Sequence, residues 1–112
     1  MNVSEIFPPA VSRSAFELYS LNRITDCSGC YCLTNAVGEI LYIGQARSIA
    51  SRLLQHFDSS KRTVATPQGR VSIAWWREEQ LEKLNALERG WIESVRLRDG
   101  VMPPLNRVGA PT

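Results

Sequence analysis

The sequence has no long hydrophobic run, few cysteines and a single histidine. No apolar stretch approaches the roughly 18 residues that a membrane-spanning helix needs, so we expect no membrane location. The first residues lack a basic flank followed by an apolar run, so we expect no secretory signal. The three cysteines, at positions 27, 30 and 32, are too few and too close together for a disulfide framework. A reducing, cytoplasmic setting is therefore expected.

The positive and negative charges nearly balance. The formal net charge is +2, from 13 basic and 11 acidic residues, which alone indicates no particular partner. The basic residues are unevenly spread, because six of them and one acid lie between Gly44 and Arg77. Such a stretch can hold a phosphate backbone, although a solvated loop has the same composition. With 112 residues and 44% hydrophobic content, the chain is expected to form one globular domain.

The residue pattern predicts an α+β fold. Positions 29–35 and 39–44 are rich in β-forming residues and flank a turn, which is typical of a hairpin. A third strand is expected at 71–76. Ser48 is expected to begin a helix of about ten residues, and 78–98 has the longest helical pattern. We therefore expect a small three-stranded sheet, antiparallel or mixed, flanked by helices.

The ends of the chain are expected to be less regular. Residues 1–13 are predicted to be an irregular lead-in, followed by a short helix capped by Ser14 with Glu17 as its capping-box partner. Gly100 is expected to end the long helix. The segment 102–106 contains two prolines and is expected to be extended.

Glu88 is an anomaly in the long helix. At about 100° per residue, five apolar side chains fall within roughly 60° of it, which places a carboxylate in the middle of the apolar stripe. These side chains are Leu81, Leu84, Trp91, Ile92 and Val95. A buried carboxylate is costly unless it is paired or bound to metal. Glu88 is therefore either one partner of a buried salt bridge, or a functional residue that binds a metal or acts as a general base. Mg²⁺ prefers carboxylate oxygen ligands of this kind.

The shorter helix has an asymmetry of its own. Arg52 and His56 are four residues apart and so are neighbours on the helix surface, beside the Ile49 edge of its apolar stripe. Arginine can bind phosphoryl oxygens bidentately and stabilise developing negative charge. Taken alone, the pair is more typical of a surface arginine over a partly exposed histidine. With Glu88 and the hairpin residues Tyr31 and Tyr42 nearby, it is also compatible with a phosphate-binding site.

These residues resemble the motifs of the GIY-YIG nuclease family. The first motif appears as Gly29-Cys30-Tyr31, with cysteine where isoleucine is usual, and the second as Tyr42-Ile43-Gly44. The remaining matches are Arg52, His56, Glu88 in Leu87-Glu88-x-x-x-Ile92, and Asn106 after Pro104-Leu105.

The resemblance implies metal-dependent hydrolysis of a DNA phosphodiester. One divalent ion, Mg²⁺ or Mn²⁺, would be held by Glu88 and a substrate phosphate. Either Tyr31 or Tyr42 would help to deprotonate the attacking water, aided by positive charge from Arg52 and the metal. His56 would relay a proton or contact the phosphate. The expected catalytic residues are Tyr31, Tyr42, Arg52, His56, Glu88 and Asn106.

By the same resemblance, 1–27 is a lead-in with a short helix, 28–107 is the nuclease domain and 108–112 is a tail. The residues expected to contact DNA are Gln45, Arg47, Lys61, Arg62 and Arg70, several of them in a polar loop predicted at 58–70. A chain of this length is expected to carry no separate targeting domain. Specificity would then come from this loop, from DNA structure, from a second copy of the chain or from a targeting partner protein.

Two other interpretations stay open. Many relatives have lysine where this chain has Gln45, and loss of that cation favours a non-catalytic nucleic-acid-binding module that keeps the fold. Glu88 argues against such a module, because a binder gains nothing from a carboxylate near phosphate. The third interpretation is a structural domain in which Glu88 forms a salt bridge with Arg52.

Overall fold

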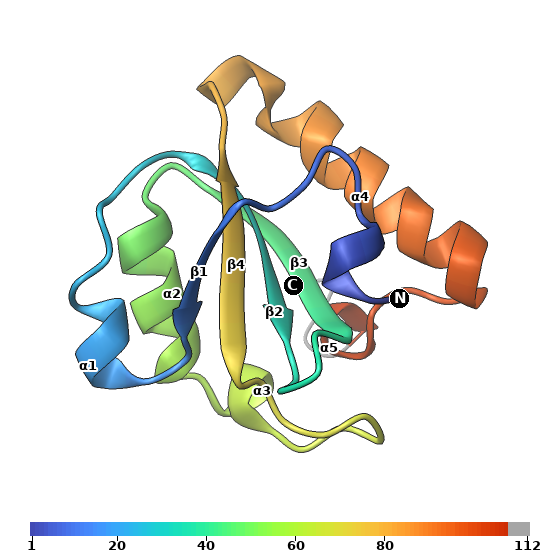
Figure 1. Ribbon diagram of the computed structural model, residues 1–112, viewed down its shortest axis with the longest axis horizontal. Coiled ribbons are helices and arrows are strands. Elements are labelled where there is room, and N and C mark those ends of the chain that lie inside the picture. The colour runs from blue at the N-terminus through green and yellow to red at the C-terminus, as the bar shows by residue number, and fades with distance from the viewer. Residues whose placement is uncertain (108–112) are drawn as a thin grey trace.

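The computed structural model describes residues 1–107 and contains an antiparallel sheet of four strands (Figure 1). The strands are β1 (Ser12–Ala15), β2 (Gly29–Thr34), β3 (Ile40–Ala46) and β4 (Ile73–Glu78). Their order across the sheet is β1-β4-β2-β3, so β3 is an edge strand. The predicted α+β class is confirmed, with one strand more than expected. The predicted tail 108–112 lies outside the described residues.

The predicted hairpin forms between β2 and β3. Asn35 shapes its turn, because the Asn35 Oδ1 accepts hydrogen bonds from the backbone N–H groups of Val37 and Glu39. Gly38 has φ of 89°, a left-handed conformation that glycine adopts without steric cost. The register pairs Tyr31 with Gly44, which brings the two sequence motifs together.

The fourth strand corrects the prediction for the N-terminal region. The strand β1 begins within the segment 1–13 predicted to be irregular and continues through Ser14, which pairs with Ala74 instead of capping a helix. The short helix α1 (Leu18–Leu21) begins after Glu17, which makes no side-chain cap bond. A capping box does form, but between Asn2 and Glu5 of the 3₁₀ helix η1 (Val3–Glu5). The residues of β1 have little strand propensity, so pairing with β4 decides their conformation.

The helix α2 (Ile49–Phe57) begins as predicted. Ser48 Oγ accepts a hydrogen bond from Ser51 N, and Asp26 Oδ1 accepts another from Ala50 N. These bonds satisfy N–H groups that a helix start leaves without partners. The loop predicted at 58–70 contains a further helix, α3 (Ser60–Thr63).

The long helix is shorter than expected. The β4 strand continues to Glu78, a 3₁₀ turn η2 (Leu81–Lys83) follows, and α4 covers Leu84–Asp99. Gly100 ends α4 as predicted, with φ of 80°. The segment 102–106 was expected to be extended, but the short helix α5 (Pro104–Arg107) begins within it, because proline is tolerated in the first turn of a helix.

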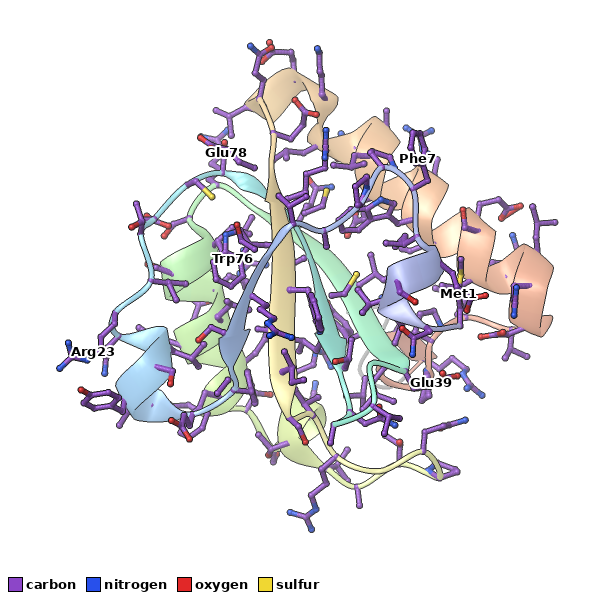
Figure 2. The ribbon with its side chains drawn as sticks, viewed as in Figure 1. Met1, Phe7, Arg23, Glu39, Trp76 and Glu78 are labelled. Carbon is purple, nitrogen blue, oxygen red and sulfur yellow. The ribbon has the colours of Figure 1, made fainter. Side chains whose placement is uncertain are left out.

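Two hydrophobic cores lie on opposite faces of the sheet. One face packs against α4 and the N-terminal segment, and the other against α1 and α2 (Figure 1). Side chains alternate along β2, so Cys30 and Cys32 belong to the first core and Tyr31 and Leu33 to the second. Trp76 projects from β4 toward α2 (Figure 2). Within residues 1–107, no helix combines the length and apolar character that crossing a membrane requires.

Candidate functional site

Three rings gather on the α2 face of the sheet. Tyr31 from β2 is fully buried, and its hydroxyl lies 2.5 Å from His56 Nε2 of α2. The Tyr42 ring from β3 lies 6.1 Å from that of Tyr31 and 5.2 Å from that of His56. A Cβ on Gly44 would lie 2.5 Å from the Tyr31 hydroxyl, so glycine is required opposite this tyrosine. The predicted site residues Tyr31, Tyr42 and His56 are therefore in mutual contact.

Burial fixes where the proton of the Tyr31–His56 pair resides. It raises the pKa of Tyr31 well above its usual range, and nearby Tyr42 raises it further, while Arg52 and Arg62 lower it in part. Burial, together with the positive charges of Arg62 and Arg52, lowers the pKa of His56 to about 4. At neutral pH the histidine is therefore neutral and the Tyr31 hydroxyl keeps its proton, so one hydrogen bond joins two uncharged groups.

Arg62 lies against the third ring of this cluster. Its Cζ is 4.2 Å from the centroid of Tyr42, and its Nη2 donates to the Tyr42 hydroxyl at 3.5 Å. The side chain is half-buried, in contrast to the exposed Lys61 beside it. Arg52, one turn before His56, is exposed on α2, where its guanidinium can reach a ligand.

Glu88 lies on the other face of the sheet, on α4. The buried positions of that helix are Leu84, Trp91 and Val95, whereas Leu81 precedes α4 and is 50% exposed. Glu88 is half-buried, and four of the five apolar side chains expected around it, Leu84, Trp91, Ile92 and Val95, pack in the first core, so only Leu81 departs from the prediction. The helical pattern counted Leu81 as part of the apolar stripe, but Leu81 lies in the 3₁₀ turn before α4, and its side chain is exposed.

The Glu88 carboxylate is held by a neutral amide. Gln45 Nε2 donates to Glu88 Oε1 at 2.8 Å and to Asn85 Oδ1 at 2.6 Å. Among residues 1–107 no ion pair involves Glu88, so the salt bridge to Arg52 expected for a purely structural domain does not form. Asn85 was missed from the sequence, although its spacing of three residues from Glu88 places both on one helix surface.

Asn106 holds the edge strand by its backbone. Its Nδ2 donates to Ile43 O at 2.9 Å, and its Oδ1 accepts from Ile43 N at 2.8 Å. These two bonds occupy the outward-facing backbone groups of β3 between Tyr42 and Gly44. In this structure Asn106 fixes the strand that carries the site.

The predicted residues thus form two groups, joined by β3. Tyr42 and Gly44 point to the α2 face and Gln45 to the α4 face, as alternation along a strand requires. The Tyr42 group and the Glu88 group therefore lie on opposite faces of the edge strand β3. Of the residues expected to contact DNA, Arg47, Lys61 and Arg70 are exposed and Gln45 is half-buried.

A comparison with protein families identifies the domain. Residues 27–99 match the model of the GIY-YIG catalytic domain, which covers more than half of the chain. This chain belongs to the GIY-YIG family. It is therefore a domain of a nuclease family, as the motifs Gly29-Cys30-Tyr31 and Tyr42-Ile43-Gly44 indicate.

Curated relatives of this GIY-YIG domain match it over shorter segments. UvrABC system protein C of Symbiobacterium thermophilum is 40% identical over 45 residues, which are 40% of this chain and 7% of that protein. The protein of the same name from Clostridium acetobutylicum is 37% identical over 43 residues, which are 38% of this chain and again 7% of the relative. The chain therefore matches only a small part of the length of these relatives.

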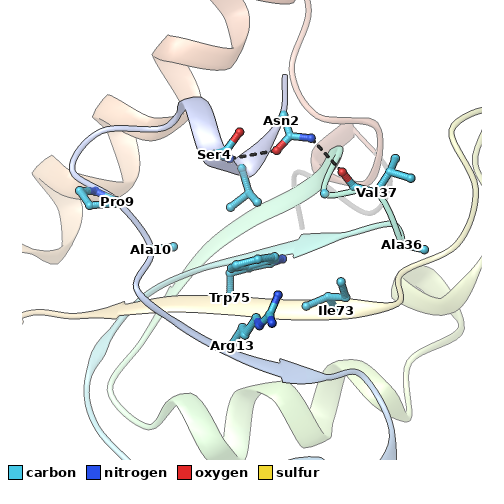
Figure 3. Close-up of a pocket in the computed structure, with 11 residues that line it drawn as sticks. Asn2, Ser4, Pro9, Ala10, Arg13, Ala36, Val37, Ile73 and Trp75 are labelled. Carbon is cyan, nitrogen blue, oxygen red and sulfur yellow. Dashed lines mark hydrogen bonds between the residues drawn. The ribbon is translucent and has the colours of Figure 1, made fainter.

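A cavity of about 310 Å³ lies elsewhere in the GIY-YIG domain, between the N-terminal segment and β4 (Figure 3). Trp75 and Arg13 line it, with the guanidinium carbon 5.5 Å from the indole ring. The Trp75 N–H donates to Thr34 Oγ1 at 2.9 Å and is thus satisfied within the fold. None of the predicted catalytic residues lines this cavity.

Proposed function

We propose that this chain is a divalent-metal-dependent endonuclease that hydrolyses phosphodiester bonds of DNA. One observation carries the proposal, namely that Glu88 is half-buried yet its carboxylate is bonded to the neutral amide of Gln45. A carboxylate in such a place has its charge uncompensated within the described residues, and a bound cation would compensate it. The family supports the same chemistry, since the matching model is that of a catalytic domain.

The residues around Glu88 fit a hard cation that keeps most of its water. Glu88 and Asn85 present oxygen atoms, which Mg²⁺ and Mn²⁺ prefer. Within residues 1–107, no group of three or more histidine, cysteine, aspartate or glutamate side chains could hold a metal. Glu88 would therefore bind one ion, with water and a substrate phosphate as further ligands. Such an ion supplies positive charge to the leaving 3′ oxygen.

The α2 face supplies the remaining chemistry. Exposed Arg52 would bind a non-bridging oxygen of the phosphate and stabilise the charge that develops there. A tyrosine would take the proton of the attacking water, whose oxygen bonds to phosphorus as the bond to the 3′ oxygen breaks. The neutral His56 holds the Tyr31 hydroxyl in place. The scissile phosphate would lie across the β3 edge, within reach of both groups.

DNA would be held by the exposed basic residues near this edge. Arg47, Lys61 and Arg70 are exposed and would contact phosphates, which makes binding weaken as salt rises. One active site makes one nick, so cleavage of both strands would need a second copy of the chain or a targeting partner. A cytoplasmic location stays a prediction based on the free cysteines at 27, 30 and 32.

A non-catalytic nucleic-acid-binding module is the second candidate. Gln45 favours it, because an amide at this position adds no positive charge to the site. The two candidates are separated by incubating the protein with supercoiled plasmid at low salt in Mg²⁺, Mn²⁺ or EDTA. An endonuclease produces nicked circles with either metal and none in EDTA. A binding module leaves the plasmid intact and gives a gel shift that weakens with salt.

A further inference from the structure

The short helix α3 directs one arginine back onto the ring cluster. Ser59 Oγ accepts from Lys61 N, and Thr63 Oγ1 donates to Ser59 O, so the turn after α2 is held at both ends. Arg62 thereby lies half-buried over Tyr42, with 4.2 Å between its Cζ and the ring centroid. A residue that only followed a DNA backbone would need neither this stacking nor the burial.

A second arginine–tyrosine pair, on the surface of the domain, provides a comparison for Arg62 and Tyr42. Arg23 lies 4.2 Å over the ring of Tyr19, but that tyrosine is 68% exposed and belongs to α1, which lies at one end of the molecule. Arg23 points outward from that end of the molecule (Figure 2). Tyr42 is half-buried beside two other rings, where a nearby charge acts through a lower dielectric and has more effect.

The two site tyrosines also differ in access to water. Tyr31 is fully buried, and its hydroxyl is occupied by His56 and packed against Gly44. Tyr42 is partly exposed on the edge strand, and its hydroxyl accepts a hydrogen bond from Arg62. Only Tyr42 of the pair can meet a water molecule at the sheet edge.

We propose that Arg62 is a positioning residue of the active site, which orients Tyr42 and stabilises its phenolate so that Tyr42 is the tyrosine that accepts the water proton. This inference rests on the proposed nuclease function. The proton passes from the attacking water to the Tyr42 oxygen, the water oxygen bonds to phosphorus, and the electron pair of the broken bond leaves with the 3′ oxygen. Tyr42 then returns its proton to solvent before the next turnover.

The charged groups around Tyr42 favour this assignment. Tyr31 faces it from β2, neutral His56 and positive Arg52 lie on α2, and Arg62 approaches from α3. From α5, Asn106 contributes an uncharged amide that is bound to the strand backbone. Glu88 of α4 lies on the opposite face of the sheet. A donor and a positive charge at a phenol oxygen both stabilise the phenolate.

The test compares Arg62→Gln and Arg62→Lys with Arg23→Gln, which removes the same charge from the equally stacked surface pair. Plasmid nicking is measured from pH 6 to 9, and unfolding in urea checks that each variant folds. We expect Arg62→Gln to slow nicking about tenfold at pH 7.5, equivalent to about 1.4 kcal/mol. The nicking rate of this variant should approach that of the wild type as pH rises. Arg62→Lys should retain most of the rate, and Arg23→Gln should match the wild type.

A second readout needs no cleavage. With ¹³Cζ-labelled tyrosine, NMR gives the phenolate fraction of Tyr42 in the protein alone, and a Tyr42→Phe variant assigns its signal. The fraction at alkaline pH should fall in Arg62→Gln and not in Arg23→Gln. An unchanged fraction overturns the inference, as does a rate loss that is equal at every pH, which would make Arg62 a phosphate contact only. If the wild type fails to nick, the proposed function fails, while the NMR result still decides the role of Arg62.

Discussion

His56 makes the stability of the fold depend on pH in a narrow window. It is the chain's single histidine, and burial with two nearby arginines lowers its pKa from 6.5 to about 4. Between these values the unfolded chain binds a proton that the native protein excludes. Stability is therefore lost as pH falls through 6.5 and stops falling near pH 4, where the native state also becomes protonated.

The size of the effect follows from that difference. Between pH 7 and pH 5 the unfolding free energy should fall by about 2 kcal/mol, since each unit of pKa difference is worth about 1.4 kcal/mol. His56 is buried, so solvent does not screen this contribution. The urea midpoint should fall by roughly 1 M over the same interval. Asp26, whose pKa is lowered from 3.8, loses its stabilising contribution only at more acidic pH, and the N-terminal amine, whose pKa is raised above 8.0, keeps its contribution throughout this interval and loses it only at alkaline pH.

The assay is urea unfolding of the wild type and of His56→Gln at pH 5, 6 and 7. The glutamine amide oxygen can still accept a hydrogen bond from Tyr31, but it does not titrate. We expect the wild type to lose about 2 kcal/mol more than the variant between pH 7 and pH 5. Parallel losses in the two proteins would refute a neutral, buried histidine paired with Tyr31.

Two further substitutions test how the site is built. Gly44→Ala should lower the unfolding free energy by about 1–3 kcal/mol, measured by thermal or urea unfolding, because its Cβ would lie 2.5 Å from the Tyr31 hydroxyl; an unchanged stability would contradict that packing. Asn106→Ala should cost about 1–3 kcal/mol, since it removes both bonds to the Ile43 backbone. Faster hydrogen exchange at the Ile43 amide should accompany that loss, and an unchanged exchange rate would show that the bonds do not hold β3.

Much of the fold was predictable because local patterns and tertiary structure agree. The hairpin turn at Asn35, the cap at Ser48 and the stop at Gly100 each combine a residue preference with a specific bond or backbone angle. The strand β1 was not predictable in this way. Residues 12–15 are poor strand formers and are held by pairing with β4, a partner distant in the sequence.

The candidate site was also predictable only in part from the sequence. Helical spacing identified Arg52 with His56, whereas the register that places Tyr31 opposite Gly44 was not predicted, because it depends on how β2 and β3 pair across the hairpin. The placement of Arg62 could not be derived, because its contact with Tyr42 depends on the turn at Ser59 between two helices. The sequence pattern singled out Glu88, but its pairing with Gln45 joins strand to helix and needed the structure.

If Glu88 binds a metal beside a substrate phosphate, as proposed, cleavage should depend on its carboxylate and the fold should not. Plasmid nicking and urea unfolding of Glu88→Gln test both expectations together, with Glu82→Gln, an exposed acid of η2, as the matched control. The glutamine can still accept the hydrogen bond from Gln45, so we expect unchanged or higher stability and complete loss of metal-dependent nicking, while Glu82→Gln nicks like the wild type. A Glu88→Gln variant that keeps nicking, or that unfolds clearly more easily than the control, would contradict this role of Glu88.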